Sequence, residues 1–287
     1  MGFFRNIPWL PCAAFLVCCL QACEEVPPAI DLLGSTLADT TYISSSVETP
    51  QQKNVLMEEF TGVKCVNCPV GHDLIASLKN QYGSRLITVS AHSNFLASPY
   101  EGDPDLRNED AEALEKLLGP LIAKPSAAID RTLFAGESSL LVLTPKWASF
   151  VAQQMNQTTP VNLKIETTYL PSDRKLTITI ILHYTKEETA PNKLMVMLIE
   201  NNIVTQQLDH SGIIPDYVQN NVLRKILTSV NSLSITPEKL PGRVIVLSFG
   251  PLSVPDSWKA TDLMVVAFVH REGASQQVLQ VAQKSIL

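Results

Sequence analysis

The chain contains 287 residues, of which 45% are hydrophobic and 17% are charged, and its formal net charge is −6. This length suits two domains, and the hydrophobic content is sufficient for packed cores. The chain is acidic and contains no cluster of lysines and arginines, which argues against a nucleic-acid-binding protein.

Residues 1–22 are predicted to be a lipoprotein signal peptide. Arg5 supplies the positive start, and the mostly apolar stretch after it is too short to span a bilayer comfortably. The segment ends in Leu20-Gln21-Ala22-Cys23, and a small residue directly before a cysteine resembles the lipobox of bacterial lipoproteins. This resemblance implies lipidation of Cys23 and attachment to a membrane. An ordinary secretory signal with an incidental cysteine is the alternative.

Residues 23–52 are predicted to be the lipidated N-terminus and a flexible tether, because they contain proline, serine and threonine clusters and show little periodicity. Removal of the signal peptide leaves Cys65 and Cys68 as the candidate disulfide of the exported chain. Export implies an oxidising compartment, where a disulfide persists. We therefore expect a lipid-anchored protein of the cell envelope.

Cys65 and Cys68 are the most informative residues of the chain. They lie in residues 58–69 (EEFTGVKCVNCP), after an apolar run that predicts a buried strand and before a helical pattern at about 68–82. A strand, a turn with C-x-x-C and a helix form the local architecture of a thioredoxin-like redox site. At the helix N-terminus, unpaired N–H groups and the helix dipole favour the thiolate of Cys65. We expect Cys65 to attack a substrate disulfide and Cys68 to release the mixed disulfide.

The remainder of residues 53–158 is predicted to alternate strands and helices. A β-branched run at 86–91 predicts a strand, and residues 106–118 predict a helix. A short strand opened by Pro125, a hairpin at 132–143 and a helix opened by Thr144 and Pro145 follow. The resulting order, β-α-β-α-β-β-α, is that of thioredoxin.

Residues 159–287 are predicted to be all β. Apolar and polar residues alternate at 161–169 and 175–184, which are joined by a turn, and similar runs continue to residue 283. Their spacing and turn residues suggest an immunoglobulin-like sandwich. The long connection at 209–229 is either a short helix or an irregular binding loop.

These motifs together resemble the family of outer-membrane protein 28-like lipoproteins of Gram-negative bacteria. The resemblance rests on the lipobox, on Glu-Glu-Phe-Thr-Gly before C-x-x-C-Pro, on Lys-Pro-Ser before Asp-Arg and on the β-rich second half. It implies an outer-membrane location, on the periplasmic or the outer face. The implied fold is an α/β thioredoxin-like domain over residues 53–158, followed by an all-β immunoglobulin-like sandwich domain over residues 159–287.

The thioredoxin resemblance also implies roles for Glu59 and Pro125. Glu59 lies six residues before Cys65, where thioredoxin keeps a buried carboxylate that moves protons for the resolving cysteine. Because Glu58 and Glu59 face opposite sides of a strand, solvent exposure of one of them is the alternative. Pro125 is expected to be the cis-proline beside the cysteines, and a trans proline opening an edge strand is the alternative.

Four further positions have a structural and a functional interpretation. Lys64, which stands where thioredoxin has tryptophan, either favours the Cys65 thiolate or is solvated. His72, one turn after Cys68, and His92, after the second strand, are interpreted mainly as structural histidines. Asp130-Arg131 is interpreted as an ion pair with a structural role.

Two functions remain from the sequence. The first is thiol–disulfide exchange with a protein partner by a lipid-anchored envelope protein. The alternative is a non-enzymatic surface adhesin or interaction protein, with a structural disulfide and a partner-binding β-sandwich. Zinc would need two further ligands beside the cysteines, and no second C-x-x-C or paired-histidine motif occurs, so we expect neither a metal nor another cofactor. The sequence leaves the oligomeric state open.

Overall fold

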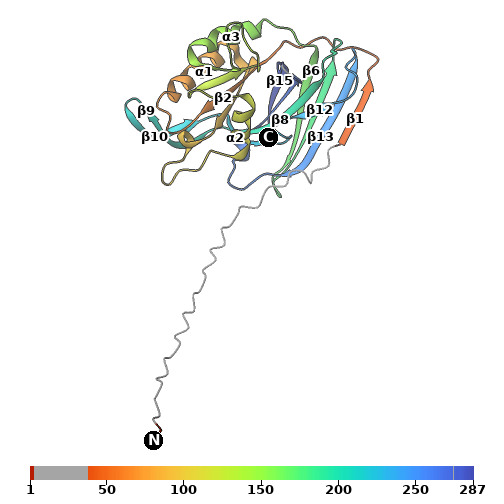
Figure 1. Ribbon diagram of the computed structural model, residues 1–287. Helices are drawn as coiled ribbons and strands as arrows, with labels where there is room; N and C mark the ends of the chain where they lie inside the picture. The colour runs from red at the N-terminus through yellow and green to blue at the C-terminus, as the bar shows by residue number, and fades with distance from the viewer. Residues whose placement is uncertain (3–37, 274) are drawn as a thin grey trace. The chain divides into compact units, whose positions relative to one another are not determined.

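A computed structural model describes residues 1–2, 38–273 and 275–287 (Figure 1). The predicted signal peptide, the lipidation site Cys23 and the first part of the predicted tether lie outside these residues, apart from residues 1 and 2. The described residues from Ala38 onward belong to one compact unit and are mostly β-strand.

The first half of this unit alternates strands and helices in the order that the sequence predicts. Its elements are β2 (Val55–Thr61), α1 (Cys68–Tyr82), β3 (Leu86–His92), α2 (Glu109–Leu118), β4 (Ser126–Ile129), β5 (Leu141–Leu143) and α3 (Trp147–Met155). β2 and β3 are parallel, whereas β4 is antiparallel to β2 and β5 is antiparallel to β4. The hairpin predicted at 132–143 is wrong, because β5 pairs with β4 across a loop in which Asp130 and Arg131 adopt positive φ.

The second half contributes strands and one short 3-10 helix (Ala260–Asp262), in agreement with the all-β prediction for residues 159–287. The strands are β6 (Val161–Leu170), β7 (Lys175–Tyr184), β8 (Asn192–Glu200), β9 (Ile203–Asp209), β10 (Gly212–Gln219), β11 (Val222–Ile226), β12 (Leu233–Ile235), β13 (Arg243–Ser253), β14 (Leu263–Arg271) and β15 (Val278–Ser285). The connection at 209–229 is neither a helix nor an irregular loop, because it forms β10 and β11. β1 (Ala38–Ile43) pairs with β13.

Strands from both halves form one large sheet. Its order is β15-β14-β8-β11-β3-β2-β4-β5, with β12 paired to β8. The halves meet where β11 lies parallel to β3, with Val222 opposite Ser90, and the Ser90 amide donates to the Asn221 carbonyl at 2.8 Å. The boundary proposed at residue 158 therefore divides the sequence, while the backbone hydrogen bonds continue across it.

The alternation of β7 explains how the second core forms. Leu176, Ile178, Ile180 and Leu182 are fully buried, and the residues between them are partly exposed, as expected for a strand with one face toward a core. They belong to a four-stranded antiparallel sheet, β1-β13-β7-β6. This sheet packs through an apolar cluster onto β8, β14 and β15 of the large sheet.

Two buried ion pairs lie where β4 ends. The Arg131 guanidinium donates two hydrogen bonds to the Glu58 carboxylate, at 2.8 and 2.7 Å, and both side chains are almost fully buried. Lys53 Nζ lies 2.6 Å from Asp130 Oδ2 in a similarly buried pair. The sequence suggested that Asp130 and Arg131 pair with each other. This prediction is wrong, because each of them pairs with a separate partner. Arg131 also lies over the ring of Phe268 from β14, 4.8 Å from its centroid.

Arg131→Ala is expected to lower the free energy of unfolding by about 3–5 kcal/mol, because it leaves the Glu58 carboxylate buried without its partner. Urea unfolding of wild type and variant measures this difference. Lys164→Ala is the matched control: the Lys164–Glu166 pair is solvent-exposed, with side chains 66% and 51% accessible, so no measurable change is expected. An equal decrease in the free energy of unfolding in both variants would contradict a stabilising role of the buried pair.

Candidate functional site

The candidate site is the turn between β2 and α1. Cys65 and Cys68 form a disulfide there, and the Cys68 amide donates to the Cys65 carbonyl at 3.1 Å. Cys68 is the first residue of α1, and Pro69 follows at a position where a helix needs no backbone donor. The structure thus brings together the two cysteines that the sequence paired.

The disulfide is buried, and the β9–β10 hairpin from the second half contacts the turn that carries it. Cys65 is 4% exposed and Cys68 is fully buried. Gln207 on β9 is buried, and its Nε2 donates to the carbonyls of Gly62 and Cys65 at 3.3 and 3.2 Å. The backbone amide of Leu208 donates to the Val63 carbonyl at 2.8 Å. The hairpin therefore binds the backbone of the turn that carries the cysteines.

Side chains of the hairpin also contact the dipeptide between the cysteines and α1. His210 Nε2 lies 3.0 Å from Asn67 Oδ1, and the Tyr217 hydroxyl lies 2.7 Å from His72 Nδ1. The sequence did not indicate these contacts, because they join residues more than 140 positions apart. The polar character of the 209–229 connection was the one available signal.

Pro125 lies beside the first turn of α1. The Lys124–Pro125 bond is cis. A Cβ atom at Gly71 would lie 2.9 Å from Pro125 Cγ, so glycine at this position allows the loop and the helix to approach closely. A groove of about 350 Å³ runs past this contact and is lined by Asn67, Val70, Ala123, Lys124, Pro125, Leu143, Thr144 and Pro145.

Neither Glu58 nor Glu59 is solvated, so that alternative is wrong. Glu58 pairs with Arg131 on one side of β2, and Glu59 is fully buried on the other side. Glu59 Oε2 accepts a hydrogen bond from Ser90 Oγ at 3.0 Å, and Oε1 lies 3.5 Å from His72 Nε2. Burial raises the pKa of the Glu59 carboxyl above its usual value. A buried carboxyl with a raised pKa can act as a general base.

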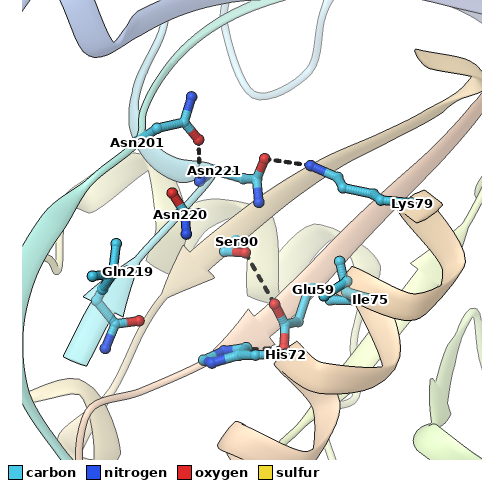
Figure 2. A pocket seen from close by; sticks show the side chains of 11 residues that line it. Glu59, His72, Ile75, Lys79, Ser90, Asn201, Gln219, Asn220 and Asn221 are labelled. Carbon is cyan, nitrogen blue, oxygen red and sulfur yellow. Dashed lines mark hydrogen bonds and ion pairs between the residues drawn. The ribbon is translucent and has the colours of Figure 1, made fainter. Parts of the chain in front are cut away.

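Glu59 forms the floor of a pocket between α1 and the turn from β10 to β11 (Figure 2). The pocket has a volume of about 250 Å³, and its walls include His72, Lys79 and Ser90 together with a run of carboxamides, Gln219, Asn220 and Asn221. Lys79 Nζ donates to Asn221 Oδ1 at 2.7 Å, and burial lowers the pKa of Lys79 to about 8. Sequence analysis missed Lys79 and these carboxamides as site residues.

Lys64 and His92 have partners or surroundings that account for them structurally. Lys64 Nζ donates to Ser98 Oγ at 3.0 Å and lies 5.1 Å from the centroid of the Tyr100 ring. His92 is almost fully buried, and burial lowers its pKa to about 3, so this histidine is neutral at physiological pH.

The described residues contain neither a metal-binding cluster nor a membrane-spanning helix. Within residues 38–273 and 275–287, no group of three or more histidine, cysteine, aspartate and glutamate side chains is arranged to hold a metal ion. In the same part of the chain, no helix has the length and apolar character needed to cross a membrane.

Comparison with known proteins identifies the family. The model of a family described as outer membrane protein Omp28 matches residues 114–287. The chain belongs to the Omp28 family. This membership places the protein in the cell envelope, at the outer membrane, in agreement with the sequence prediction. No curated protein matches the chain.

Solved structures are similar to this chain to different degrees, and the first of them shows a related fold. HBP35 of Porphyromonas gingivalis is 22% identical, with a TM-score of 0.62, and the match covers 83% of this chain and 77% of that one. Protein AGR_C_4864 from Agrobacterium tumefaciens is 12% identical, with a TM-score of 0.49 over 82% of this chain and 95% of that one. A domain of the outer membrane lipoprotein Omp28 from Porphyromonas gingivalis is 17% identical, with a TM-score of 0.30, and the match covers 45% of this chain and 88% of that one.

Glu59→Gln is expected to change how stability depends on pH. Because the pKa of Glu59 is raised above its usual value of 4.5, the folded protein keeps this proton at pH values where the unfolded chain has lost it. Its contribution to stability is complete below a pH of about 4.5 and is lost as the pH rises through the folded-state pKa. We therefore expect the free energy of unfolding of the variant to rise relative to that of wild type as the pH rises through this window. Urea unfolding at a series of pH values measures this difference.

The control for this experiment is Glu166→Gln, which alters an exposed carboxyl. Asp130, whose pKa is also raised by burial, is present in all three proteins, so its contribution cancels. A difference between wild type and Glu59→Gln that does not vary with pH would contradict the raised pKa.

Proposed function

We propose that this protein is a lipid-anchored outer-membrane protein that exchanges thiols and disulfides through Cys65 and Cys68. The observation that carries the proposal is the position of the disulfide, at the start of α1 and close to the Pro125 loop. Disulfide exchange requires a cysteine whose thiolate is stabilised, and a helix N-terminus supplies that stabilisation.

We propose a thioredoxin-like fold for residues 53–158. The strand order β3-β2-β4-β5, with β2 and β3 parallel and β4 and β5 antiparallel, supports this assignment. Apolar residues of α1 and α3 pack in one cluster, and those of α2 pack in another, so the helices cover both faces of this part of the sheet. For residues 159–287 we propose an immunoglobulin-like sandwich, supported by the packing of the four-stranded sheet on β8, β14 and β15.

The proposed exchange starts from the oxidised pair as follows. A thiolate of the partner protein attacks Cys65 Sγ, and the Cys65–Cys68 bond breaks with the electron pair on Cys68. A second thiolate of the partner then attacks the partner sulfur that is bonded to Cys65. This step forms a disulfide within the partner and releases Cys65 as a thiolate. The partner leaves oxidised and the pair leaves reduced, and the same steps run in reverse when the partner is a disulfide. Glu59 is the proposed acceptor and donor of the proton of Cys68.

Exchange requires displacement of the β9–β10 hairpin, because both cysteines are buried and the hairpin contacts the turn that carries them. The hairpin forms its own two-stranded sheet and does not pair with the strands of the large sheet. Its contacts with the site include a few hydrogen bonds, from Gln207, Leu208, His210 and Tyr217. Such contacts contribute individually modest free energies, which is compatible with opening.

The second candidate is a non-enzymatic interaction protein with a structural disulfide. The burial of Cys65 and Cys68 favours this function, because a disulfide without access to a partner does not exchange. The sandwich would then carry the partner-binding surface. Both candidates agree on the location in the envelope and differ in the redox properties of the pair.

The reduction potential of the Cys65–Cys68 pair decides between the two. We expect a potential between about −120 and −270 mV, the range of known exchange catalysts. The measurement equilibrates the purified protein with defined thiol buffers and counts alkylated cysteines by mass, and the Cys65→Ser variant identifies the signal of the pair. A potential below about −300 mV would match a structural disulfide and would reject the exchange function.

Cys23→Ser is expected to release the protein from the membrane fraction, because the acyl chains on Cys23 supply the proposed anchor. Fractionation of cells that express wild type or variant measures this change. Cys65→Ser serves as control and should remain with the membranes. Retention of the Cys23→Ser protein in the membrane fraction would show that lipidation is not the anchor.

A further inference from the structure

The pocket above Glu59 has the size of a small-molecule site. Its volume of about 250 Å³ corresponds to roughly eight water molecules at about 30 Å³ each. It leads from the exposed rim residues Ala76, Val218 and Asn220 down to the buried side chain of Glu59. The walls combine α1 and β3 of the first half with residues 201 and 218–221 of the second half, so the site exists only in the assembled fold.

The floor of the pocket presents an acceptor whose hydrogen-bonding capacity is unused. Glu59 Oε1 is buried and accepts no hydrogen bond, with His72 Nε2 at 3.5 Å as its nearest charged neighbour, whereas Oε2 accepts from Ser90 Oγ. Buried polar groups in proteins are nearly always paired, so an exception that faces a cavity points to a donor supplied by a ligand or by water. A carboxylate in this position prefers a donor that carries positive charge.

Lys79 supplies the opposite charge in the same pocket. An ammonium has three donors, and one of those on Lys79 Nζ meets Asn221 Oδ1. Figure 2 shows this contact, with the carboxamides of Asn201 and Asn220 close to it. Glu59 and Lys79 line the same pocket, so both charges would act on one ligand. A simple cation would be repelled by Lys79, and a simple anion would be repelled by Glu59.

We infer that this pocket binds a small zwitterion, a free α-amino acid, with its ammonium on Glu59 and its carboxylate on Lys79 and the neighbouring carboxamides. The apolar wall residues Ile75, Ala76 and Val218 favour a small aliphatic side chain over a charged one. This ligand site uses neither cysteine, and it shares Glu59 with the proposed exchange function.

Saturation-transfer NMR with the purified full-length protein tests the inference. L-alanine is the probe, and N-acetyl-L-alanine and L-alaninamide are the matched controls that lack the ammonium charge and the carboxylate. We expect a signal from L-alanine at about 10 mM, and no signal from either control. Glu59→Gln and Lys79→Met should each weaken L-alanine binding about tenfold or more, because each removes a charge-assisted hydrogen bond. Lys116→Met, an exposed residue on α2, should leave binding unchanged.

Thermal unfolding of each variant establishes that it is folded before binding is compared. Two results would overturn the inference: no signal from L-alanine with wild type, or equal binding of N-acetyl-L-alanine. Unchanged binding by both folded variants, Glu59→Gln and Lys79→Met, would also overturn it. The reduction potential of wild type is measured independently, so failure of the ligand site and failure of the exchange function are distinguishable.

Discussion

The arrangement of this protein depends on the buried pair of Glu58 and Arg131. Arg131 comes from the loop after β4, Glu58 comes from β2, and the guanidinium lies against Phe268 of β14. Because a charge without its partner is costly in the interior, separation of β2 from the loop after β4 would be strongly unfavourable. The neighbouring Lys53–Asp130 pair acts in the same way, and the Asp130 carbonyl accepts the amide of Val278 from β15. Phe268 and the amide of Val278 thus join the second half of the chain to the residues that form these ion pairs.

This joining of the halves gives the cysteine turn its environment. Once β11 lies beside β3, the β9–β10 hairpin that precedes β11 comes to contact the turn that carries the disulfide. The contacts of the hairpin with this turn are mainly polar, and they use the backbone of Gly62, Val63 and Cys65 as well as side chains. A site that looks local in the sequence is therefore controlled by residues from the other half.

The two neighbouring glutamates of β2 show how a single strand serves both stability and chemistry. Successive side chains of a strand face opposite sides, so Glu58 enters the interface between the halves and Glu59 enters the pocket beside α1. Glu58 is neutralised by a bidentate arginine, whereas Glu59 has a hydroxyl and a histidine as neighbours and a raised pKa. The first carboxylate forms a buried ion pair, and burial raises the pKa of the second.

The sequence by itself determined the local features: the C-x-x-C turn before α1, the order of elements in residues 53–158, the cis bond at Pro125 and the all-β second half. The turn, the order of elements and the all-β half follow from periodicity, helix signals and motif spacing, all of which act over a few residues, whereas the cis bond was implied by the resemblance to thioredoxin. The sequence did not determine the partners of Asp130 and Arg131, the strands at 209–229 or the contacts of the β9–β10 hairpin with the cysteine turn. Those depend on contacts between residues 60 to 150 positions apart, which only the packing of the folded chain selects, because buried charges and backbone groups must find partners wherever the chain can supply them.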